Sequence, residues 1–440
     1  MSPLRIYGEH DERTVQQLQR CAAAEDNAPA VLCADGHLGY SMPIGGVVGY
    51  RQFVSPSGVG YDIACGNLAV QTAICAADVP AADFGRWADE IQQRVSFGVG
   101  RKNNEPVDAP VLDDIARSPI PQQRSMAQLA AAQLGTVGSG NHYVDVLEDE
   151  QGLLWVGVHF GSRGFGHKTA TGFMNVARGR PWDHGGGEGS MDAPPLLLSL
   201  EKPTGQDYVT AMALAGKYAY AGREAVVAKV LEILGVSAAW SVHNHHNFAW
   251  RERHRGSDYW VVRKGATPAF PGQYGFVGGS MGDISVIVRG VDSDASREAL
   301  YSTVHGAGRV MSRTQAAGKQ RWHKVWACMD YRHCDGQLPV ETPRGANGEN
   351  PKCPKCGHKM QRKPSVERVR AGAVDFDAEK AKLERAGIVL RGAGADEAPP
   401  VYRPLRSVLD AHAATIEIVH TLRPRIVVMA GGEEFDPYKD

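Results

Sequence analysis

The sequence lacks any long apolar run. Its densest apolar stretch, residues 194–200, is far shorter than the roughly 20 residues that a membrane-spanning helix needs. Residues 1–14 mix acidic and basic side chains, whereas a secretory signal would carry an apolar segment. We therefore expect no contact with a membrane and a cytoplasmic location.

An excess of charge of either sign is also missing. The chain has 48 Lys and Arg against 49 Asp and Glu, a formal net charge of −1. The chain as a whole has no excess of positive charge that would indicate a nucleic-acid partner. An enzyme acting on nucleic acid would therefore have to concentrate positive charge locally. Two basic stretches, 251–264 and 352–370, are candidates, although such a stretch is more often a solvated surface.

Regular elements are recognisable but do not alternate strictly. Apolar residues at helical spacing predict helices over 14–24, 125–134 and 207–234, the last being the strongest. Apolar runs at 153–158, 259–262, 284–288, 416–419 and 426–428 favour strands. This order predicts a complex α+β fold. Segments 177–195 and 314–363 look like insertions.

Glycine is abundant, with 51 residues gathered into short clusters. Such clusters allow sharp turns and close backbone approach to a ligand. They also bracket potential metal ligands. Asp62 and Cys65 lie three residues apart in the glycine-flanked segment 58–66, and His142 and His159 lie in similar surroundings. Carboxylate, thiolate and imidazole ligands suit Mn²⁺, Fe²⁺ or Zn²⁺, and a thiolate can bridge two ions.

A further group of histidines, His243, His245 and His246, occupies one short segment. Each histidine taken alone is more often a surface or hydrogen-bonded residue than a ligand. Together, these groups in glycine-rich loops predict a site for two metal ions. The residues themselves do not say which member of the triplet is the ligand.

Eight segments form a specific series along the chain. They are DGHLGYSMPIGGV at 35–47, GVGYDIACG at 58–66, GNH at 140–142, HFGSR at 159–163, HN at 246–247, RKGAT at 263–267, GSMG at 279–282 and HGAGRVMSR at 305–313. Taken in this order, they resemble the RtcB family, and the resemblance covers about residues 30–316 and resumes at 397–402.

The resemblance implies an RtcB-like α+β fold with a central active-site cleft. It assigns His305 as the nucleophile that attacks the α-phosphate of GTP. It also implies roles for the other matching positions. The metal ligands would be Asp62, Cys65, His142, His159 and His246, holding two Mn²⁺; the nucleotide contacts would be Asn141, Gly279, Ser280, Met281, Gly282, Gly306, Ala307, Gly308 and Tyr402; the RNA phosphate contacts would be Asp35 and Arg163.

The implied activity is GTP- and Mn²⁺-dependent joining of RNA ends, in tRNA splicing or RNA repair. A 2′,3′-cyclic phosphate end is opened to a 3′-phosphate, GMP passes to it from the histidine, and a 5′-hydroxyl displaces GMP. The implied partners are RNA, as tRNA halves or broken RNA, and an archease-type activator. An imidazole that is neutral near pH 7 can attack phosphorus, and metal ions neutralise the charge that develops.

A separate cluster of cysteines marks the second insertion. Cys328 and Cys334 precede Cys353 and Cys356, and the second pair has the spacing of a zinc knuckle. The first pair is looser, so His333 is an alternative ligand to Cys334. We predict a structural Zn²⁺ ribbon at 324–363, inserted between core segments 1–323 and 364–440. Its basic residues leave two roles open, contact with RNA or a partner and a purely structural clamp.

The chain also departs from the family pattern. Met429 or Ala430 stands where a lysine usually contacts guanine, and Arg403 follows Tyr402 where a lysine is usual. These differences leave GTP and ATP both open as the nucleotide. Two other functions compete with ligation: a metal-dependent RNA cyclic phosphodiesterase or phosphatase, and a non-catalytic RNA-binding protein. Retention of His305 and of every metal-ligand position favours the ligase.

Overall fold

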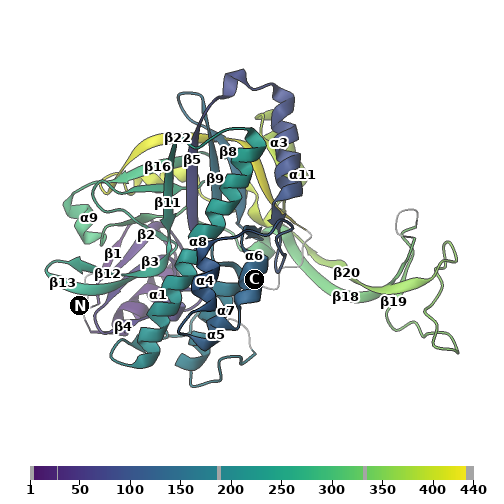
Figure 1. Cartoon of the computed structure of the whole chain (residues 1–440), viewed down its shortest axis with the longest axis horizontal. Helices are drawn as coiled ribbons and strands as arrows, with labels where there is room; N and C mark the ends of the chain where they lie inside the picture. The colour runs from purple at the N-terminus through teal and green to yellow at the C-terminus, as the bar shows by residue number, and fades with distance from the viewer. Residues whose placement is uncertain (1–3, 27, 186–189, 331–333, 433–440) are drawn as a thin grey trace.

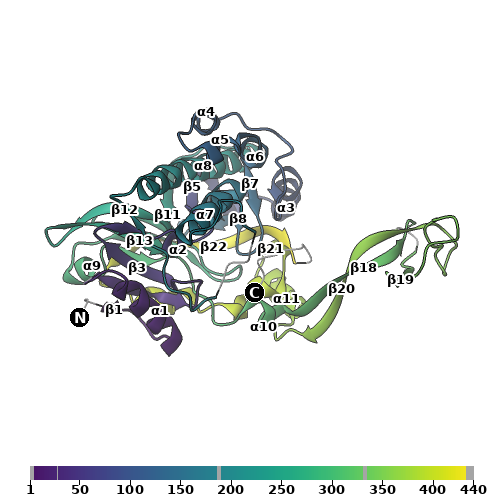
Figure 2. The same ribbon diagram turned by 90° about the horizontal axis from the view of Figure 1, so that it is seen from below.

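The computed structural model describes residues 4–26, 28–185, 190–330 and 334–432. Two sheets and the helices around them form the body, and a long hairpin projects from it (Figures 1 and 2). This arrangement confirms the predicted α+β class. Within the described residues, no helix combines the length and apolar character needed to cross a membrane.

The smaller sheet has five strands, and its neighbours β2 and β3 are antiparallel. The larger has eight strands, with β21 lying parallel to β22 off the main order. The five-stranded order is β1 (Leu4–Ile6), β2 (Ala30–His37), β3 (Ile44–Tyr50), β13 (Ser257–Lys264) and β12 (Asn247–His254). The eight strands are β11 (Trp240–His245), β5 (Gly66–Cys75), β9 (Leu153–Phe160), β8 (Tyr143–Glu148), β22 (Ile416–Gly431), β16 (Ser285–Gly290), β15 (Tyr274–Val277) and β21 (Val389–Ala393).

Short strand pairs complete the body. They are β4 (Phe53–Val54) with β10 (Leu198–Ser199), β6 (Ser96–Phe97) with β7 (Thr136–Gly138), and β14 (Ala266–Pro268) with β17 (Ser302–Val304). The helices are α1 (Glu12–Ala23), α2 (Pro56–Val59), α3 (Ala81–Arg94), α4 (Pro110–Ala116), α5 (Pro121–Arg124), α6 (Ala127–Gln133), α7 (Arg163–Ala177), α8 (Pro203–Leu234), α9 (Asp294–Glu298), α10 (Arg313–Ala317), α11 (Phe376–Arg385) and α12 (Leu405–Asp410).

Helix α8 covers one face of the eight-stranded sheet (Figure 1). Side chains alternate between the two faces of a strand, so the side chains of β9 pack into two different cores. Val156, Val158 and Phe160 share a core with residues of α8, whereas Trp155 belongs to a second core on the opposite face. His159 has the same parity as Trp155 and therefore lies on the face away from α8. The strand alternation thus places a polar ligand inside an apolar sheet.

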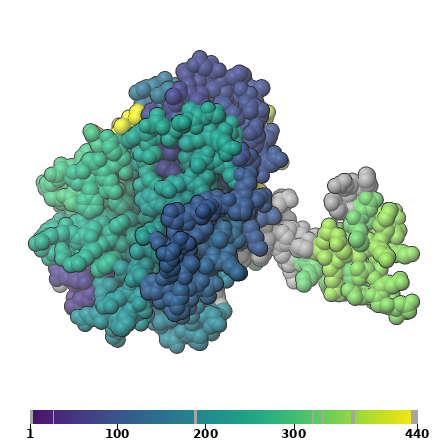
Figure 3. All heavy atoms as spheres, viewed as in Figure 1, coloured from purple at the N-terminus to yellow at the C-terminus, as the bar shows by residue number. Residues whose placement is uncertain are grey.

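The projecting hairpin consists of β18 (Gly318–Cys328), the short β19 (Gln337–Pro339) and β20 (Met360–Ala371). We call residues 318–371 the arm. Figures 1 and 3 show its tip standing clear of the body. The boundaries expected from the sequence, 324 and 363, fall inside the paired strands, because the hairpin ladder runs from Gly318 opposite Ala371 to the tip.

Candidate active site and metal centre

Asp62 and Cys65 are carried by a tight turn between α2 and β5. The Cys65 N–H donates to the Asp62 carbonyl at 3.1 Å, and Ala64 between them has a positive φ of 59°. At Gly66 the neighbouring strand leaves no room for a side chain, since a Cβ would lie 2.1 Å from the Asn244 carbonyl oxygen. The glycine therefore permits the close pairing of β5 with β11 that holds the turn beside His246.

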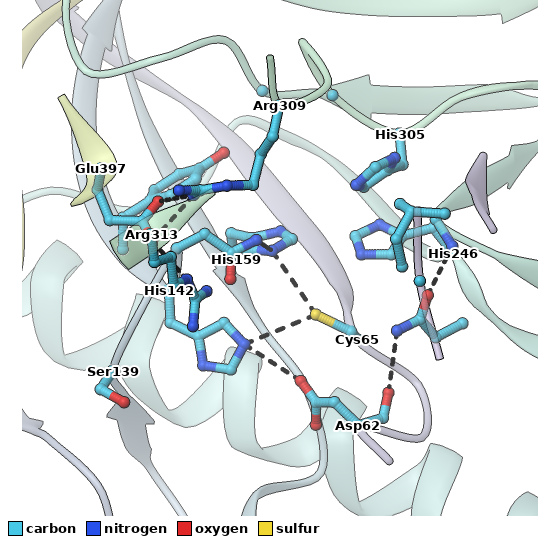
Figure 4. Close-up of a pocket in the computed structure, with 18 of the residues that line it drawn as sticks. Asp62, Cys65, Ser139, His142, His159, His246, His305, Arg309, Arg313 and Glu397 are labelled. Carbon is cyan, nitrogen blue, oxygen red and sulfur yellow. Dashed lines mark hydrogen bonds and ion pairs between the residues drawn. The ribbon is translucent and has the colours of Figure 1, made fainter. Parts of the chain in front are cut away.

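Two of the histidines are held with one ring nitrogen directed at Cys65. His142 Nδ1 lies 3.0 Å from the Val137 carbonyl oxygen, which can only accept, so Nδ1 carries the proton. His159 Nδ1 lies 2.6 Å from Asn67 Oδ1. With the proton on Nδ1, Nε2 is the ring nitrogen that can bind a metal. It stands 3.7 Å (His142) and 3.6 Å (His159) from Cys65 Sγ, and His142 Nε2 also lies 3.1 Å from Asp62 Oδ2 (Figure 4). These are the tautomers that metal ligation requires.

The structure separates the three clustered histidines. His246 lies with Cys65 and His159, and its buried Nδ1 has no hydrogen-bond partner among the described residues. His243 and His245 instead accept hydrogen bonds from Arg223, at 2.8 and 3.0 Å. An unpartnered buried nitrogen is costly unless something binds it, so His246 is the member of the triplet that suits a metal.

Two groups of ligand atoms result, and Cys65 belongs to both. One group is Cys65, His159 and His246, and the other is Asp62, Cys65 and His142; within each, the atoms lie within 4.8 Å of one another. Burial raises the pKa of the Cys65 thiol well above its usual value and lowers that of His159 and His246 well below theirs. The His159 and His246 imidazoles are therefore neutral, and the carboxylate, thiolate and imidazole donors fit divalent metal ions.

Arg223 on α8 connects the two segments that carry ligands. Its Nη1 donates to the carbonyl oxygens of Ala64, at 3.0 Å, and Phe160, at 2.6 Å. These residues directly adjoin Cys65 and His159. The side chain is fully buried, and burial lowers its pKa to about 10, so it remains charged near neutral pH.

His305 follows β17 and faces the metal-ligand groups, its ring centroid 4.8 Å from that of His246. Its Nδ1 lies 2.6 Å from Asp35 Oδ2, which also accepts from the backbone N–H groups of His305 and Gly306. Burial opposes ionisation of Asp35, but the charge and hydrogen bonds of His305 outweigh it, and the pKa of the carboxyl is lowered. The ionised Asp35 thus holds the proton on Nδ1 and leaves the lone pair on Nε2.

The assignment of Asp35 to RNA phosphate is therefore wrong. Its side chain has 0% exposure and lies behind His305, away from any surface that RNA could reach. A carboxylate would also repel a phosphate. Sequence position alone could not show this burial, because Asp35 lies in a glycine-rich segment typical of an exposed loop.

A cavity of about 980 Å³ joins these groups. Nearly all of the nucleotide and phosphate positions expected from the sequence line it, including Arg163 from the start of α7. Gly282 does not belong to the wall; a Cβ there would meet Leu383 of α11 at 2.8 Å. The expected positions that line the cavity are Asn141, Gly279, Ser280, Met281, Gly306, Ala307, Gly308, Tyr402 and Arg163.

Sequence reasoning missed one buried acid in the same wall. Asp145 on β8 lines the cavity, is 7% exposed, and its Oδ1 has no hydrogen-bond partner among the described residues. Burial raises the pKa of this carboxyl well above its usual value. Met429, one of the two residues expected at the position of the absent lysine, also lines the cavity. An unsatisfied carboxyl oxygen in a pocket wall needs a donor from a ligand.

An arginine pair was also missed. Arg309 and Arg313 both contact Glu397, at 3.2 and 3.3 Å, and Figure 4 shows them across the cavity from His246. Arg309 also donates to the Tyr402 hydroxyl at 3.0 Å. These residues follow His305 at intervals of four, a spacing that could have indicated a shared helix-like face.

The four cysteines of the arm come together near its tip. Cys328 Sγ lies 3.3 Å from Cys356 Sγ, and Cys334 Sγ lies 3.5 Å from Cys353 Sγ. All four sulfurs lie within 4.8 Å of one another. A tetrahedral zinc with Zn–S bonds near 2.3 Å separates its sulfurs by roughly 3.8 Å, so this cluster fits the ion. The alternative ligand, His333, lies outside the described residues.

Comparison with known proteins agrees with this geometry. The family model described as "tRNA-splicing ligase RtcB" matches residues 17–121 and 116–339. The chain is 34% identical over 313 residues to the RNA-splicing ligase RtcB of Escherichia coli K12, covering 64% of this chain and 74% of that protein.

Two archaeal relatives extend the match. The tRNA-splicing ligase RtcB of Archaeoglobus fulgidus is 32% identical over 374 residues, covering 67% of this chain and 76% of that protein. The enzyme of the same name from Thermococcus kodakarensis is 28% identical over 413 residues, covering 73% and 83%. The family match, together with these relatives, shows that the chain belongs to the RtcB family.

Proposed function

We propose that this protein is an RNA ligase that joins 2′,3′-cyclic phosphate or 3′-phosphate ends to 5′-hydroxyl ends, using GTP and two Mn²⁺. One observation carries the proposal: two three-residue ligand groups share Cys65, and His305 stands beside one of them. A hydrolase could use the same histidine as a general base, so the covalent GMP adduct on His305 is what distinguishes the ligase.

His305 acts as the nucleophile. Asp35 fixes its tautomer, so Nε2 can form a bond to the α-phosphorus of GTP while the bond to the pyrophosphate leaving group breaks. The developing imidazolium is stabilised by the buried Asp35 carboxylate. Asp62, Cys65, His142, His159 and His246 would hold the metal ions, which supply positive charge that neutralises the phosphates.

Asp145 supports guanine as the base. The Watson–Crick edge of guanine presents two donors, N1–H and the 2-amino group, which an ionised carboxylate can accept together. Adenine offers one donor and one acceptor and matches only a protonated carboxyl. Asp145 therefore distinguishes guanine from adenine in place of the missing lysine, and we propose GTP as the nucleotide.

The RNA steps follow from the same cavity. A cyclic phosphate is first hydrolysed to a 3′-phosphate; an oxygen of this phosphate then attacks the phosphorus of the guanylylated histidine, and His305 leaves. Finally a 5′-hydroxyl attacks the activated 3′-phosphate, and GMP leaves. Arg163, Arg309 and Arg313 line the cavity and would hold the phosphates. We also propose a structural Zn²⁺ on the four cysteines of the arm.

Protein mass spectrometry after incubation with GTP and Mn²⁺ tests the proposal. The wild type should gain the mass of GMP through an acid-labile, alkali-stable bond, and His305→Ala should not. The exposed His184 offers a matched control, since His184→Ala should label normally. An RNA with a 3′-phosphate and one with a 5′-hydroxyl should then be joined only by labelling-competent proteins.

The competing functions give different results. A phosphodiesterase or phosphatase would open the cyclic phosphate or release phosphate with no protein adduct, and an RNA-binding protein would show neither. ATP, tested in parallel, separates the mechanism from the nucleotide: labelling by ATP alone would keep His305 as the nucleophile and overturn GTP. Ligation by His305→Ala at the wild-type rate would refute the proposal.

A further inference from the structure

The near-neutral charge of the whole chain conceals an uneven distribution. Residues 318–371, the arm, contain 12 Lys and Arg but only five Asp and Glu, a net charge of +7. The rest of the chain has 36 Lys and Arg against 44 Asp and Glu, a net charge of −8. A zinc ion bound by four thiolates would carry a charge of −2, and the arm would still be at +5.

The arm places positive charges directly opposite one another. Lys319 on β18 is the cross-strand partner of Arg370 on β20 at the root, and Lys352 bridges to Lys359 near the tip. All four residues are exposed, and in the described chain none of these side chains has an acidic partner. Like charges in directly opposed positions destabilise a strand pair.

The arm is also long and separate from the body. Its strand β18 has 11 residues, which corresponds to about 35 Å at the rise of an extended strand. Figure 3 shows that no part of the body covers its tip on the face in view. A narrow ribbon of this kind buries little apolar surface. The repulsion between its paired cations therefore lowers its stability without any compensating gain in folding. A polyanion lying along the ribbon would offset the repulsion at both ends.

The root of the arm lies beside the active site. Strand β18 follows α10 directly, and Arg313, the first residue of that helix, lines the cavity. After β20 the chain continues into α11, whose Leu383 packs in one apolar cluster with Met281 of the nucleotide loop. A chain bound along the arm would therefore be led toward the cavity.

We propose that the arm binds the phosphate backbone of the RNA substrate outside the cavity and extends the enzyme's contact along one of the two RNA strands. The identification of RNA rests on the proposed function, because RNA is the polyanion that would leave the cavity beside the arm. The contacts are to backbone phosphates and do not depend on base sequence. A zinc ion bound by the four cysteines would hold the pair near the tip in place.

The test compares two variants of the full-length protein. In the arm variant, Lys319, Arg370, Lys352 and Lys359 are all replaced by Gln. In the control, four exposed cations of the body are replaced by Gln, which removes the same charge: Arg117, Lys202, Lys217 and Arg253.

Binding of a fluorescent 3′-phosphate RNA is measured without GTP across a salt series. With about 25 nucleotides, enough to span an arm of about 35 Å, the arm variant should bind about 10- to 100-fold more weakly, and its log-affinity against log-salt slope should fall by up to about 3. The control should bind as the wild type does. An RNA of about 5 nucleotides reaches only the root of the arm, so the arm variant should lose less affinity for it than for the long RNA.

The readouts separate this proposal from the ligase function. GMP labelling of His305 and zinc content should be unchanged in the arm variant, and its thermal midpoint should stay or rise because repulsion is removed. Failure of wild-type labelling would count against the ligase and leave the RNA-binding comparison standing. Equal binding of long RNA by the wild type and the arm variant would overturn the proposal, and so would equal weakening in the control. If the arm bound a partner protein instead of RNA, the wild type and the arm variant would bind the long RNA equally.

Discussion

Replacing Asp145 with Asn should change which base the nucleotide pocket accepts. The substitution preserves size but turns one carboxylate oxygen into an NH₂ group. Guanine would then meet a donor with its own 2-amino donor, and one charged hydrogen bond would be lost. A hydrogen bond to a charged group contributes about 1.5–3 kcal/mol, so the kcat/KM for His305 labelling by GTP should fall about 10- to 150-fold.

Xanthine offers the complementary test. Its ring keeps the N1–H donor but has an oxygen at position 2, which can accept from the Asn amide. XTP should therefore label Asp145→Asn better than GTP does, and should label the wild type poorly because two acceptors would face each other. The rate of GMP or XMP transfer to His305 is measured by mass spectrometry of the protein over time.

The protonation state of Asp145 adds a pH dependence with a definite sign. Burial raises the pKa of this carboxyl, and guanine is recognised by its ionised form. Labelling by GTP should therefore increase as pH rises, and labelling by ATP, which matches the protonated acid, should decrease. The assignment would be refuted if Asp145→Asn were labelled by GTP as fast as the wild type. It would also be refuted if GTP labelling of the wild type did not change with pH.

Three further predictions concern the framework of the site. Ser at both Cys353 and Cys356 should remove a Zn²⁺ that survives dialysis and destabilise the arm while sparing the catalytic ions; unchanged zinc by metal analysis would contradict the cluster. Arg223→Lys cannot contact both carbonyls next to the ligands, so titration should show Mn²⁺ binding about 10- to 100-fold weaker. His412 is buried and its pKa is lowered to about 4 by burial. Its neutral form stabilises the fold above the unfolded pKa near 6.5, and this contribution, about 3 kcal/mol, is lost as pH falls from 6.5 to 4. In His412→Gln, the free energy of unfolding should change less across this range.

The strongest elements of the fold were predictable because their periodicity is local. The expected helix at 207–234 is most of α8, and the run at 153–158 lies within β9. The runs at 416–419 and 426–428 belong to one 16-residue strand, β22. Pro424 separates them, and the ladder shifts register between Pro424 and Ile426. A proline at an irregularity interrupts the sequence pattern without ending the strand.

The candidate ligands were predictable for a different reason. Asp62, Cys65 and His142 lie in short glycine-bounded turns, where a polar residue has no packing role to explain it. Asp145 gives no such signal. It alternates with Val144 and Val146 in an ordinary strand pattern, and its significance comes from burial against a cavity whose wall includes Met429, far away in the sequence. Only the folded chain brings these two residues together.

The geometry of the site also depends on how the two sheets meet. His159 lies on β9 of the eight-stranded sheet and His142 directly precedes its strand β8, whereas Asp35, which orients His305, lies on β2 of the five-stranded sheet. Asn247 spans the junction, because its amide donates to the Asp62 carbonyl and accepts from the Gly265 N–H. Gly265 in turn packs against His305, where a Cβ would lie 3.0 Å from the ring. The distance between His305 and the candidate metal ligands is therefore set by contacts between sheets, which is why it could not follow from any motif taken by itself.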